Sequence, residues 1–342
     1  MKIRRFVMFC AIALAIVSAA PAVAQIQPRT APLNPDGHPD LIGTWLDNSA
    51  TPLERPKELE GRQFLTDAEV LELRKRADRL FKSDKGDFAA GDNVFLAALA
   101  NPDRFSNPNA TCKSDATPER EFDNRTSLII DPPDGKIPPL TPEAKRRQSA
   151  LRNATAAGLS PPAGPEDLNS AIRCITPGVP RLGGRYGAGD YGYYQIAQTP
   201  DHVVLFNEIM HQTRIIPLDG RPHLPASIRT WDGDSRGRWD GKTLVVDTTN
   251  FSAKSNFMGS SENLHLTERF TRIAGDEIRY EITIDDPTVW TRPWTAMVRL
   301  RRTEEKLYEN ACHEGNRPLE DILTGARAQE KAAEDAASKR EK

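Results

Sequence analysis

Apolar and polar residues alternate along much of the C-terminal half of this chain. Between 278 and 285 every second residue is apolar, and this set is Ile278, Tyr280, Ile282 and Ile284. The same period returns in a second set, Trp294, Ala296, Val298 and Leu300. Successive side chains of a strand point to opposite faces, so each segment has one apolar and one wetter face, which is typical of an antiparallel sheet.

The strand pattern predicts a mainly β protein. We expect strands near 41–45, 193–199, 202–209, 211–217, 243–249, 264–273, 278–285, 294–302 and 306–311. Such a series predicts an antiparallel meander that forms a barrel or a barrel-like sheet, with a two-sheet sandwich as the alternative. The segment 232–243, DGDSRGRWDGKT, begins like the calcium-binding loop of an EF-hand, with Asp232, Asp234 and Gly237 at matching positions. Arg236 and Thr243 stand where that loop needs acidic ligands, so we expect a turn between strands and not a calcium site.

Helical insertions are expected in the N-terminal half. Thr66 and Glu69 form a capping box before an apolar stripe, which predicts a helix from about Thr66 to Lys82. Thr141 before Pro142 predicts another helix start. We therefore expect an extended lead-in over 25–40 and a single β-rich domain over 41–325. The helical insertion would occupy about 66–160, and a charged tail would follow over 326–342.

Residues 1–24 have the features of a signal peptide. A basic start precedes an apolar core over 6–20, and Ala22-Val23-Ala24 fits a cleavage site. We expect a mature chain that begins at Gln25 and is periplasmic or secreted. No later segment approaches 18 continuous apolar residues, so no integral membrane segment is expected after cleavage. The formal net charge is −2 with no basic domain, which argues against nucleic acid as a partner. The sequence leaves the oligomeric state open.

Three cysteines follow the predicted cleavage site, namely Cys112, Cys174 and Cys312. An exported protein can form disulfides, and an odd number leaves at least one cysteine unpaired. Cys112 and Cys174 both lie in loop-like segments flanked by proline. We therefore expect a Cys112–Cys174 disulfide and a free, buried Cys312.

Several long motifs resemble a large, uncharacterised family of exported bacterial proteins. They include RIIPLDGRPHLP, GRWDGKTLVVDTTNF, NLHLTERFTR, DPTVWTRPWT and YENACHEGN, and the resemblance covers about 123–326. It implies a shared structure but supplies no activity and no catalytic residue. The GTW at 43–45 is also similar to the short G-x-W motif of lipocalin-like barrels.

Acid–base chemistry is suggested by a few polar side chains in unexpected places. Glu268 shares one face of its predicted strand with Leu264, Leu266 and Phe270, and a buried carboxylate needs a partner or a shifted pKa. His265 lies on the opposite face, so the two cannot reach one site on a regular strand. The catalytic candidates are His223, His265, Glu268 and Tyr308. The structural alternative for Glu268 is a carboxylate paired with a nearby arginine.

Binding candidates surround the stretch MHQTRIIPLDGRPHLP at 210–225. Its prolines fix an extended exit from the predicted strand. The ligand-binding candidates are His211, Arg214, Arg221, Trp231, Arg292, Trp294 and His313. Trp231, Trp290, Trp294 and Arg292 are expected at one mouth of the barrel. No metal or cofactor is predicted, because the histidines, among them His211, His223, His265 and His313, show neither H-x-H nor H-E-x-x-H spacing.

These features lead to three hypotheses of function. The first is a cofactor-free lyase or hydrolase that acts on a small sugar or aromatic compound in a polar–aromatic cavity. The second is a lipocalin-like protein that binds a small molecule without catalysis, and the third is an envelope structural or assembly protein. For the first we expect Glu268, His223 and Arg292 to converge in one cavity.

Overall fold

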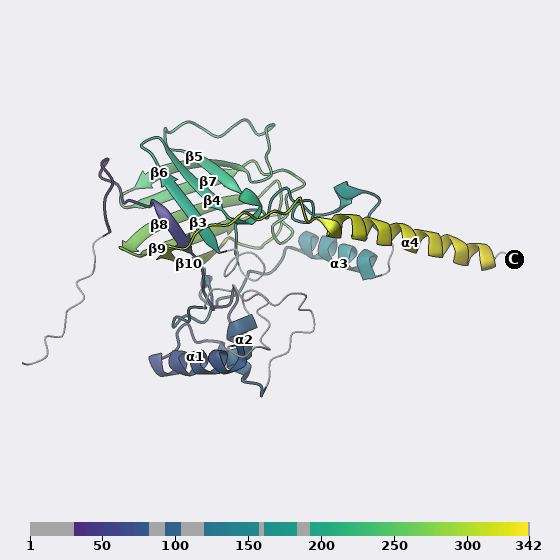
Figure 1. The fold of residues 1–342 in the computed structure, drawn as a ribbon, viewed down its shortest axis with the longest axis horizontal. Coiled ribbons are helices and arrows are strands. Elements are labelled where there is room, and N and C mark those ends of the chain that lie inside the picture. The colour runs from purple at the N-terminus through teal and green to yellow at the C-terminus, as the bar shows by residue number, and fades with distance from the viewer. Residues whose placement is uncertain (1–30, 82–92, 104–119, 157–160, 183–191, 341–342) are drawn as a thin grey trace, which may run out of the picture.

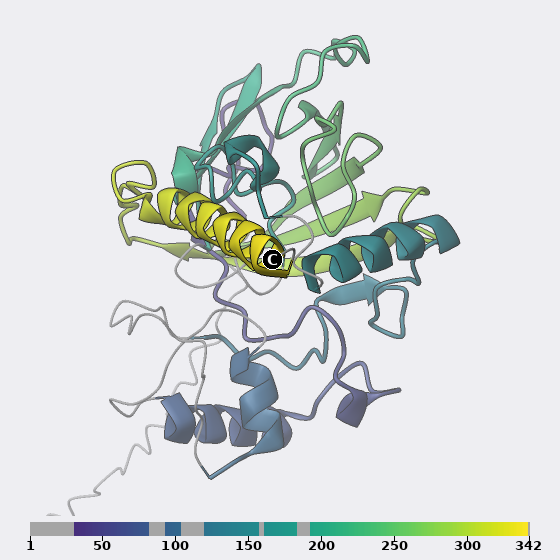
Figure 2. The same ribbon diagram turned by 90° about the vertical axis from the view of Figure 1, so that its right-hand side faces the viewer.

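The computed structural model describes residues 31–81, 93–103, 120–156, 161–182 and 192–340. The predicted signal peptide and Cys112 lie outside the described residues. Within them, one sheet dominates the fold, and helices are attached below it and to one side (Figures 1 and 2).

The sheet is an antiparallel meander, as the alternation predicts. Its path runs β5-β4-β3-β1-β10-β9-β8-β7-β6, and β2 pairs with β10 beside this path. The strands are β1 (Gly43–Leu46), β2 (Ile129–Asp131), β3 (Tyr193–Gln198), β4 (His202–Asn207), β5 (Thr213–Pro217), β6 (Asp234–Asp240), β7 (Thr243–Thr249), β8 (His265–Ala274), β9 (Glu277–Asp285) and β10 (Trp294–Thr303). The sheet is barrel-like but not closed, because its end strands β5 and β6 share no ladder.

We call the junction between β5 and β6 the seam. The two strands are neighbours in space. Every pairing on the path is antiparallel, so strand direction alternates and these first and ninth strands run parallel. Gly237 of β6 allows their close approach: a Cβ added there would lie 2.6 Å from Leu218 Cδ2 and 2.9 Å from Ile216 Cγ2. The seam is therefore packed near Gly237 without being hydrogen-bonded as a ladder.

Two of the strand predictions were wrong. β6 occupies most of the segment expected to be a turn, and residues 306–311 contain no strand. The inward positions of β6 include Ser235 and Gly237, which are small and polar or lack a side chain. The strand faces a crowded seam and a polar network, so it does not show the apolar alternation by which the other strands were found.

The concave side of the sheet is filled mainly by apolar side chains. The two alternating sets from β9 and β10 are buried there, together with apolar residues of β3, β4, β7 and β8. A second apolar cluster joins α1 (Asp67–Phe81) to α2 (Asn93–Ala100), in a layer below the sheet (Figure 1). The capping box before α1 is confirmed, since Glu69 N donates to Thr66 Oγ1 and Thr66 N donates to Glu69 Oε2.

The remaining helices lie in connections between strands or follow the last strand. They are α3 (Pro142–Ala156), α4 (Arg317–Arg340) and the short 3-10 helices η1 (Lys57–Leu59), η2 (Pro165–Asp167) and η4 (Ile209–His211). Thr141 Oγ1 accepts a hydrogen bond from Ala144 N, which confirms the predicted start of α3. α4 extends away from the sheet (Figure 1). Among the described helices, none combines the length and the apolar character needed to cross a bilayer.

Candidate functional site

A cleft opens where β5 and β6 separate at their N-terminal ends. It has a volume of about 370 Å³ and is mostly polar. Its lining comes from residues 175–176, from 213–215 at the start of β5, and from 230–236, which leads into β6. We call this space the seam cleft. The side chains that give it chemical character are Arg214, Trp231, Asp232, Asp234 and Arg236.

Arg214 connects the seam cleft to a buried polar network. It pairs with Glu268 through two contacts, Nη1 to Oε1 at 3.0 Å and Nη2 to Oε2 at 2.5 Å. Nη2 also donates to Ser235 Oγ at 3.0 Å and to Thr248 Oγ1 at 3.1 Å. Tyr280 OH donates to Glu268 Oε1 at 2.6 Å. We call these five residues the inner network.

The inner network is a charge pair held in an apolar interior. Glu268 is 0% exposed and Arg214 is 8% exposed. Burial acts to lower the pKa of Arg214, but the attraction of Glu268 more than offsets this and the pKa lies above its ordinary value. Burial, followed by the charge of Glu268, raises the pKa of Tyr280, so its hydroxyl remains a donor. Glu268 is therefore satisfied by the structural partner that the sequence left as the alternative.

One donor of Arg214 is left over. Its buried Nε has no hydrogen-bond partner among the residues that the structure describes. In a planar guanidinium, Nε and Nη2 share an edge, and here Nη2 contacts Ser235, which lines the seam cleft. A buried donor without an acceptor is costly.

A second polar group lies on the opposite face of the same strands. His223 Nδ1 is 2.8 Å from Asp234 Oδ2, and His223 Nε2 is 2.8 Å from Asp247 Oδ1. The other oxygen of Asp247 is 2.6 Å from His265 Nε2. We call Asp234, His223, Asp247 and His265 the outer chain. Arg236 Nη1 adds a contact of 2.8 Å to Asp234.

Strand geometry explains why the two groups lie back to back. Asp234 and Ser235 are consecutive on β6, and Asp247 and Thr248 are consecutive on β7. Because neighbouring side chains of a strand point to opposite faces, one member of each pair joins the outer chain and the other joins the inner network. The seam cleft reaches both groups, through Asp234 and through Arg214.

Carboxylates hold both histidines of the outer chain. Both ring nitrogens of His223 face carboxylate oxygens. The hydrogen bond that His265 makes to Asp247 raises the pKa of His265 above 6.5. The same hydrogen bond, with a smaller contribution from His223, lowers the pKa of Asp247 below 3.8. The outer chain is thus a row of alternating carboxylates and imidazoles along the outer face of the sheet.

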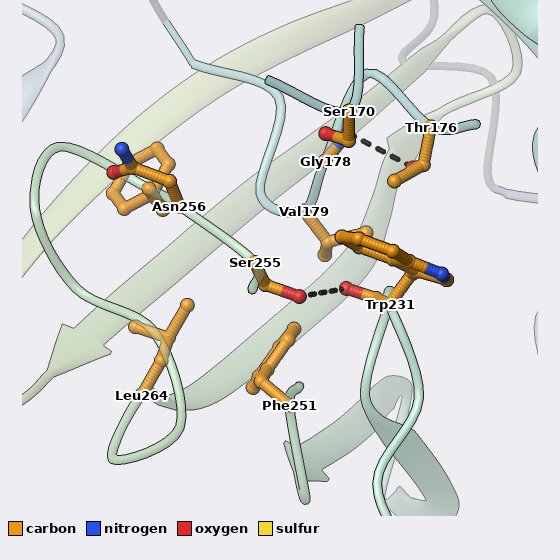
Figure 3. Close-up of a pocket in the computed structure, with 10 residues that line it drawn as sticks. Ser170, Thr176, Gly178, Val179, Trp231, Phe251, Ser255, Asn256 and Leu264 are labelled. Carbon is orange, nitrogen blue, oxygen red and sulfur yellow. Dashed lines mark hydrogen bonds between the residues drawn. The ribbon is translucent and has the colours of Figure 1, made fainter. Parts of the chain in front are cut away.

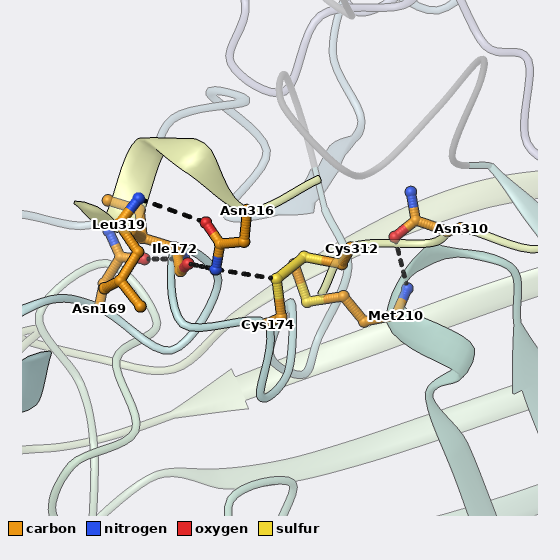
Figure 4. The surroundings of a disulfide bond; sticks show 8 residues. All are labelled: Asn169, Ile172, Cys174, Met210, Asn310, Cys312, Asn316 and Leu319. Carbon is orange, nitrogen blue, oxygen red and sulfur yellow. Dashed lines mark hydrogen bonds between the residues drawn. A yellow bond between two sulfur atoms is a disulfide. The ribbon is translucent and has the colours of Figure 1, made fainter. Parts of the chain in front are cut away.

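One wall of the seam cleft is formed by Ile175 and Thr176, and a disulfide fixes the segment that precedes them. Cys174 is bonded to Cys312, which corrects the expected pairing of Cys174 with Cys112 and the expected free Cys312. Asn316 Nδ2 donates to Ile172 O and to Cys174 Sγ (Figure 4). These contacts fix the segment immediately before Ile175 and Thr176, the two wall residues. Both paired cysteines lie in loops, so the loop argument alone did not identify the right partner.

Trp231 separates the seam cleft from a small hollow behind it. The hollow is lined by apolar side chains, among them Val179, Phe251 and Leu264, and by polar ones, among them Ser170, Ser255 and Asn256. It has a volume of about 10 Å³ (Figure 3). Trp231 and Thr176 line both spaces. Ser255 Oγ donates to Trp231 O at 2.7 Å, which anchors the backbone of this turn.

The expected convergence of Glu268, His223 and Arg292 is wrong. Glu268 belongs to the inner network, and His223 belongs to the outer chain on the opposite face. Arg292 is exposed and pairs with Asp131 at 2.9 Å. His265 and Glu268 are an odd number of residues apart on β8, so their side chains point to opposite faces of the sheet. His223 lies in the loop between β5 and β6, and this loop passes over the outer face.

The other sequence candidates are distributed over the molecule. Trp294 is 0% exposed and packs with Trp290 and Phe257 in the core, so it does not share a mouth with Trp231. Tyr308 is 71% exposed. Arg221 forms an exposed ion pair with Asp219. The remaining two are also exposed, His211 at the end of η4 and His313 in a turn. Of the eleven candidates, the structure brings Arg214 and Trp231 to the seam cleft, Glu268 behind Arg214, His223 beside Asp234, and His265 beside Asp247.

The carboxylates of this region were not among the predicted site residues. Asp232 and Asp234 lie in the segment 232–243, which was expected to be a turn, and Asp247 was not predicted to have a role. A signal for Asp247 exists, because it lies between the apolar positions of β7 and so points to the face that carries His265. Across the described residues, no group of three or more His, Cys, Asp or Glu side chains is arranged to hold a metal ion.

Comparisons with family models and with curated proteins find no match for this chain.

Proposed function

We propose that this protein is a cofactor-free enzyme, a lyase or a hydrolase, that acts on a small sugar-like compound in the seam cleft. The observation that carries this proposal is the double role of Asp234. Its carboxylate lines the cleft and is also the first member of the outer chain. A carboxylate held in this way is oriented before a ligand arrives, which is a requirement for acid–base catalysis.

The lining favours a neutral compound with many hydroxyl groups. Arg214 is neutralised by Glu268, and Arg236 is neutralised by Asp234, so the cleft offers no excess positive charge to an anion. It does offer the carboxylate acceptors of Asp232 and Asp234. Trp231 adds an aromatic surface of the kind that packs against the apolar face of a sugar ring.

Asp232 and Asp234 are the catalytic candidates. Both line the seam cleft, but their partners differ, because Asp232 Oδ1 accepts a hydrogen bond from Thr176 Oγ1 whereas Asp234 faces Arg236 and His223. In a hydrolase, one protonated carboxyl would donate its proton to the leaving oxygen. The other, ionised carboxylate would accept a proton from the attacking water as the C–O bond breaks. For a lyase, one carboxylate would instead remove a carbon-bound proton, a C=C bond would form as the C–O bond breaks, and the other, protonated carboxyl would donate its proton to the departing oxygen. His223 and His265 would position Asp234.

The test is turnover by the full mature chain on a panel of glycosides and uronate disaccharides. Released reducing ends would report hydrolysis, and ultraviolet absorbance of an unsaturated product would report a lyase. Asp234→Asn should lower kcat by at least about a hundredfold without unfolding the protein. Asp240→Asn is the matched control, because Asp240 lies on the same strand and forms an exposed pair with Arg269. Equal loss in both variants would contradict the proposal.

A non-catalytic binding protein is the second candidate. It is favoured by the contacts of His223, whose two nitrogens are both engaged by carboxylates and so are not free to exchange protons with a ligand. A ligand of this protein would occupy the seam cleft and not a lipocalin-like interior, since the interior cavity beside Arg214 and Tyr280 has a volume of only about 10 Å³. Saturable binding with no product from any member of the panel would favour this candidate.

We also propose that the protein acts in the periplasm or outside the cell. The Cys174–Cys312 disulfide supports this, because disulfides persist in oxidising compartments. The basic start and apolar core of residues 1–24 support it independently. N-terminal sequencing of the exported protein should begin at Gln25, and a retained Met1 in a cytoplasmic fraction would contradict the proposal.

A further inference from the structure

We propose that the ligand is a glycoside with an apolar aglycone, and that this aglycone lies against Ile215 and Ile175 at the mouth of the seam cleft. The inference rests on the proposed function and adds the class of the ligand to it. It comes from the way in which polar and apolar groups are distributed with depth.

Ile215 is an apolar side chain in a place where polar ones are expected. It is 63% exposed on β5, an end strand of the sheet, and it lines the seam cleft. Its neighbours Arg214 and Ile216 point inward and are buried, so Ile215 must point outward. Single exposed apolar residues are common on protein surfaces. Ile215 differs because it borders a cleft that also contains Ile175 and Trp231.

The deep part of the seam cleft has the opposite character. Arg214, Asp234 and Ser235 are all buried. The order is therefore polar at depth and apolar toward solvent, whereas a typical pocket for an apolar molecule is apolar at depth. A purely polar sugar would leave Ile215 in water. A purely apolar molecule would take Asp232 and Asp234 farther out of water without giving their carboxylates a further hydrogen-bond donor.

An aryl glycoside matches both levels at once. Its sugar hydroxyls would reach Asp232, Asp234 and Arg214, while its ring would cover Ile215 and the edge of Trp231. The hollow behind Trp231 has a volume of only about 10 Å³, which is too small for an aromatic ring. The aglycone is thereby directed to the open side, where Ile215 and Ile175 lie.

The experiment is isothermal titration of Asp234→Asn, which we expect to bind without turnover, with matched methyl and phenyl glycosides of several common hexoses and pentoses. Phenol alone is the third probe. For the sugar that binds, we expect the phenyl glycoside to bind about tenfold more tightly than the methyl glycoside, because the ring removes apolar surface from water. Ile215→Ser, introduced into the Asp234→Asn protein, should reduce the affinity for the phenyl glycoside to that for the methyl glycoside. Ile273→Ser, at another exposed strand position, should preserve the difference.

The outcomes separate the two proposals. Equal affinity for methyl and phenyl glycosides would overturn the aglycone contact while leaving a sugar-binding cleft. Loss of the difference in both serine variants would also overturn it, since only Ile215 lines the cleft. Phenol binding as tightly as the phenyl glycoside, or no binding of any glycoside by either Asp234→Asn or the natural chain, would overturn the proposed function itself. Urea unfolding curves of both serine variants, compared with Asp234→Asn, would show that each is folded.

Discussion

Arg214 and Glu268 are 54 residues apart in the sequence and form a two-point ion pair inside the sheet. The pair links an end strand at the seam to the middle of β8, on the far side of β6 and β7. Arg214 can therefore line the seam cleft while both of its Nη atoms are held by hydrogen bonds inside the sheet. The position of this arginine is a property of the whole fold and not of its local sequence.

Removing the charge of Glu268 should mainly affect stability. Glu268→Gln leaves the buried guanidinium of Arg214 without its carboxylate, and we expect the free energy of unfolding to fall by about 3 kcal/mol or more. Urea denaturation measures this. Glu281→Gln, which alters a pair with the exposed Arg279, should cost at most about 1 kcal/mol. Similar small losses in both variants would show that the inner network does not stabilise the fold.

The long strands with an apolar face could be predicted from the sequence, whereas β6, which has no such face, was not predicted. Strict alternation identified β9 and β10, whose inner positions are large and apolar. β6 was missed because its inner positions meet the seam at Gly237 and the inner network at Ser235. The burial of Glu268 was visible from its apolar neighbours, but its partner Arg214 was not, because pairing across an unlinked seam depends on how the sheet curls.

The disulfide should matter for both stability and ligand binding. Cys174→Ser removes a covalent link across 138 residues and should lower the free energy of unfolding by about 2 to 5 kcal/mol. The wall residues Ile175 and Thr176 follow Cys174 directly, so we expect weaker ligand binding as well. A non-reducing peptide map should show Cys174 joined to Cys312 in the natural chain and in Cys112→Ser. A Cys112–Cys174 peptide would contradict the structure.

The outer chain should give a window of pH in which it stabilises the fold. The pKa of His265 is raised above 6.5, so its contribution is complete below 6.5 and is lost as pH rises through the folded value. The pKa of Asp247 is lowered below 3.8, so its contribution is complete above 3.8 and is lost as pH falls through the folded value. Urea unfolding of the natural chain and of His265→Gln should differ most between these limits. A difference that grows at alkaline pH would have the wrong sign.

Close packing at the seam can be tested at Gly237. A methyl group there would meet Leu218 and Ile216 at less than 3 Å, so one of them must move. Gly237→Ala should lower the free energy of unfolding by about 1 to 3 kcal/mol through overpacking. Gly164→Ala is the control, because nothing lies within 4 Å of its added Cβ. A neutral effect at Gly237 would mean that β5 and β6 are farther apart than described.

A crystal structure of Asp234→Asn with a bound phenyl glycoside tests most directly whether the seam cleft is the ligand site. The substitution keeps the size of the aspartate side chain, and we expect it to prevent turnover. We predict electron density for the sugar between Trp231 and Arg214, with a sugar hydroxyl within hydrogen-bond distance of the Asp232 carboxylate. The aromatic ring should lie on Ile215. A glycoside bound elsewhere on the molecule, with the seam cleft empty, would contradict the proposal.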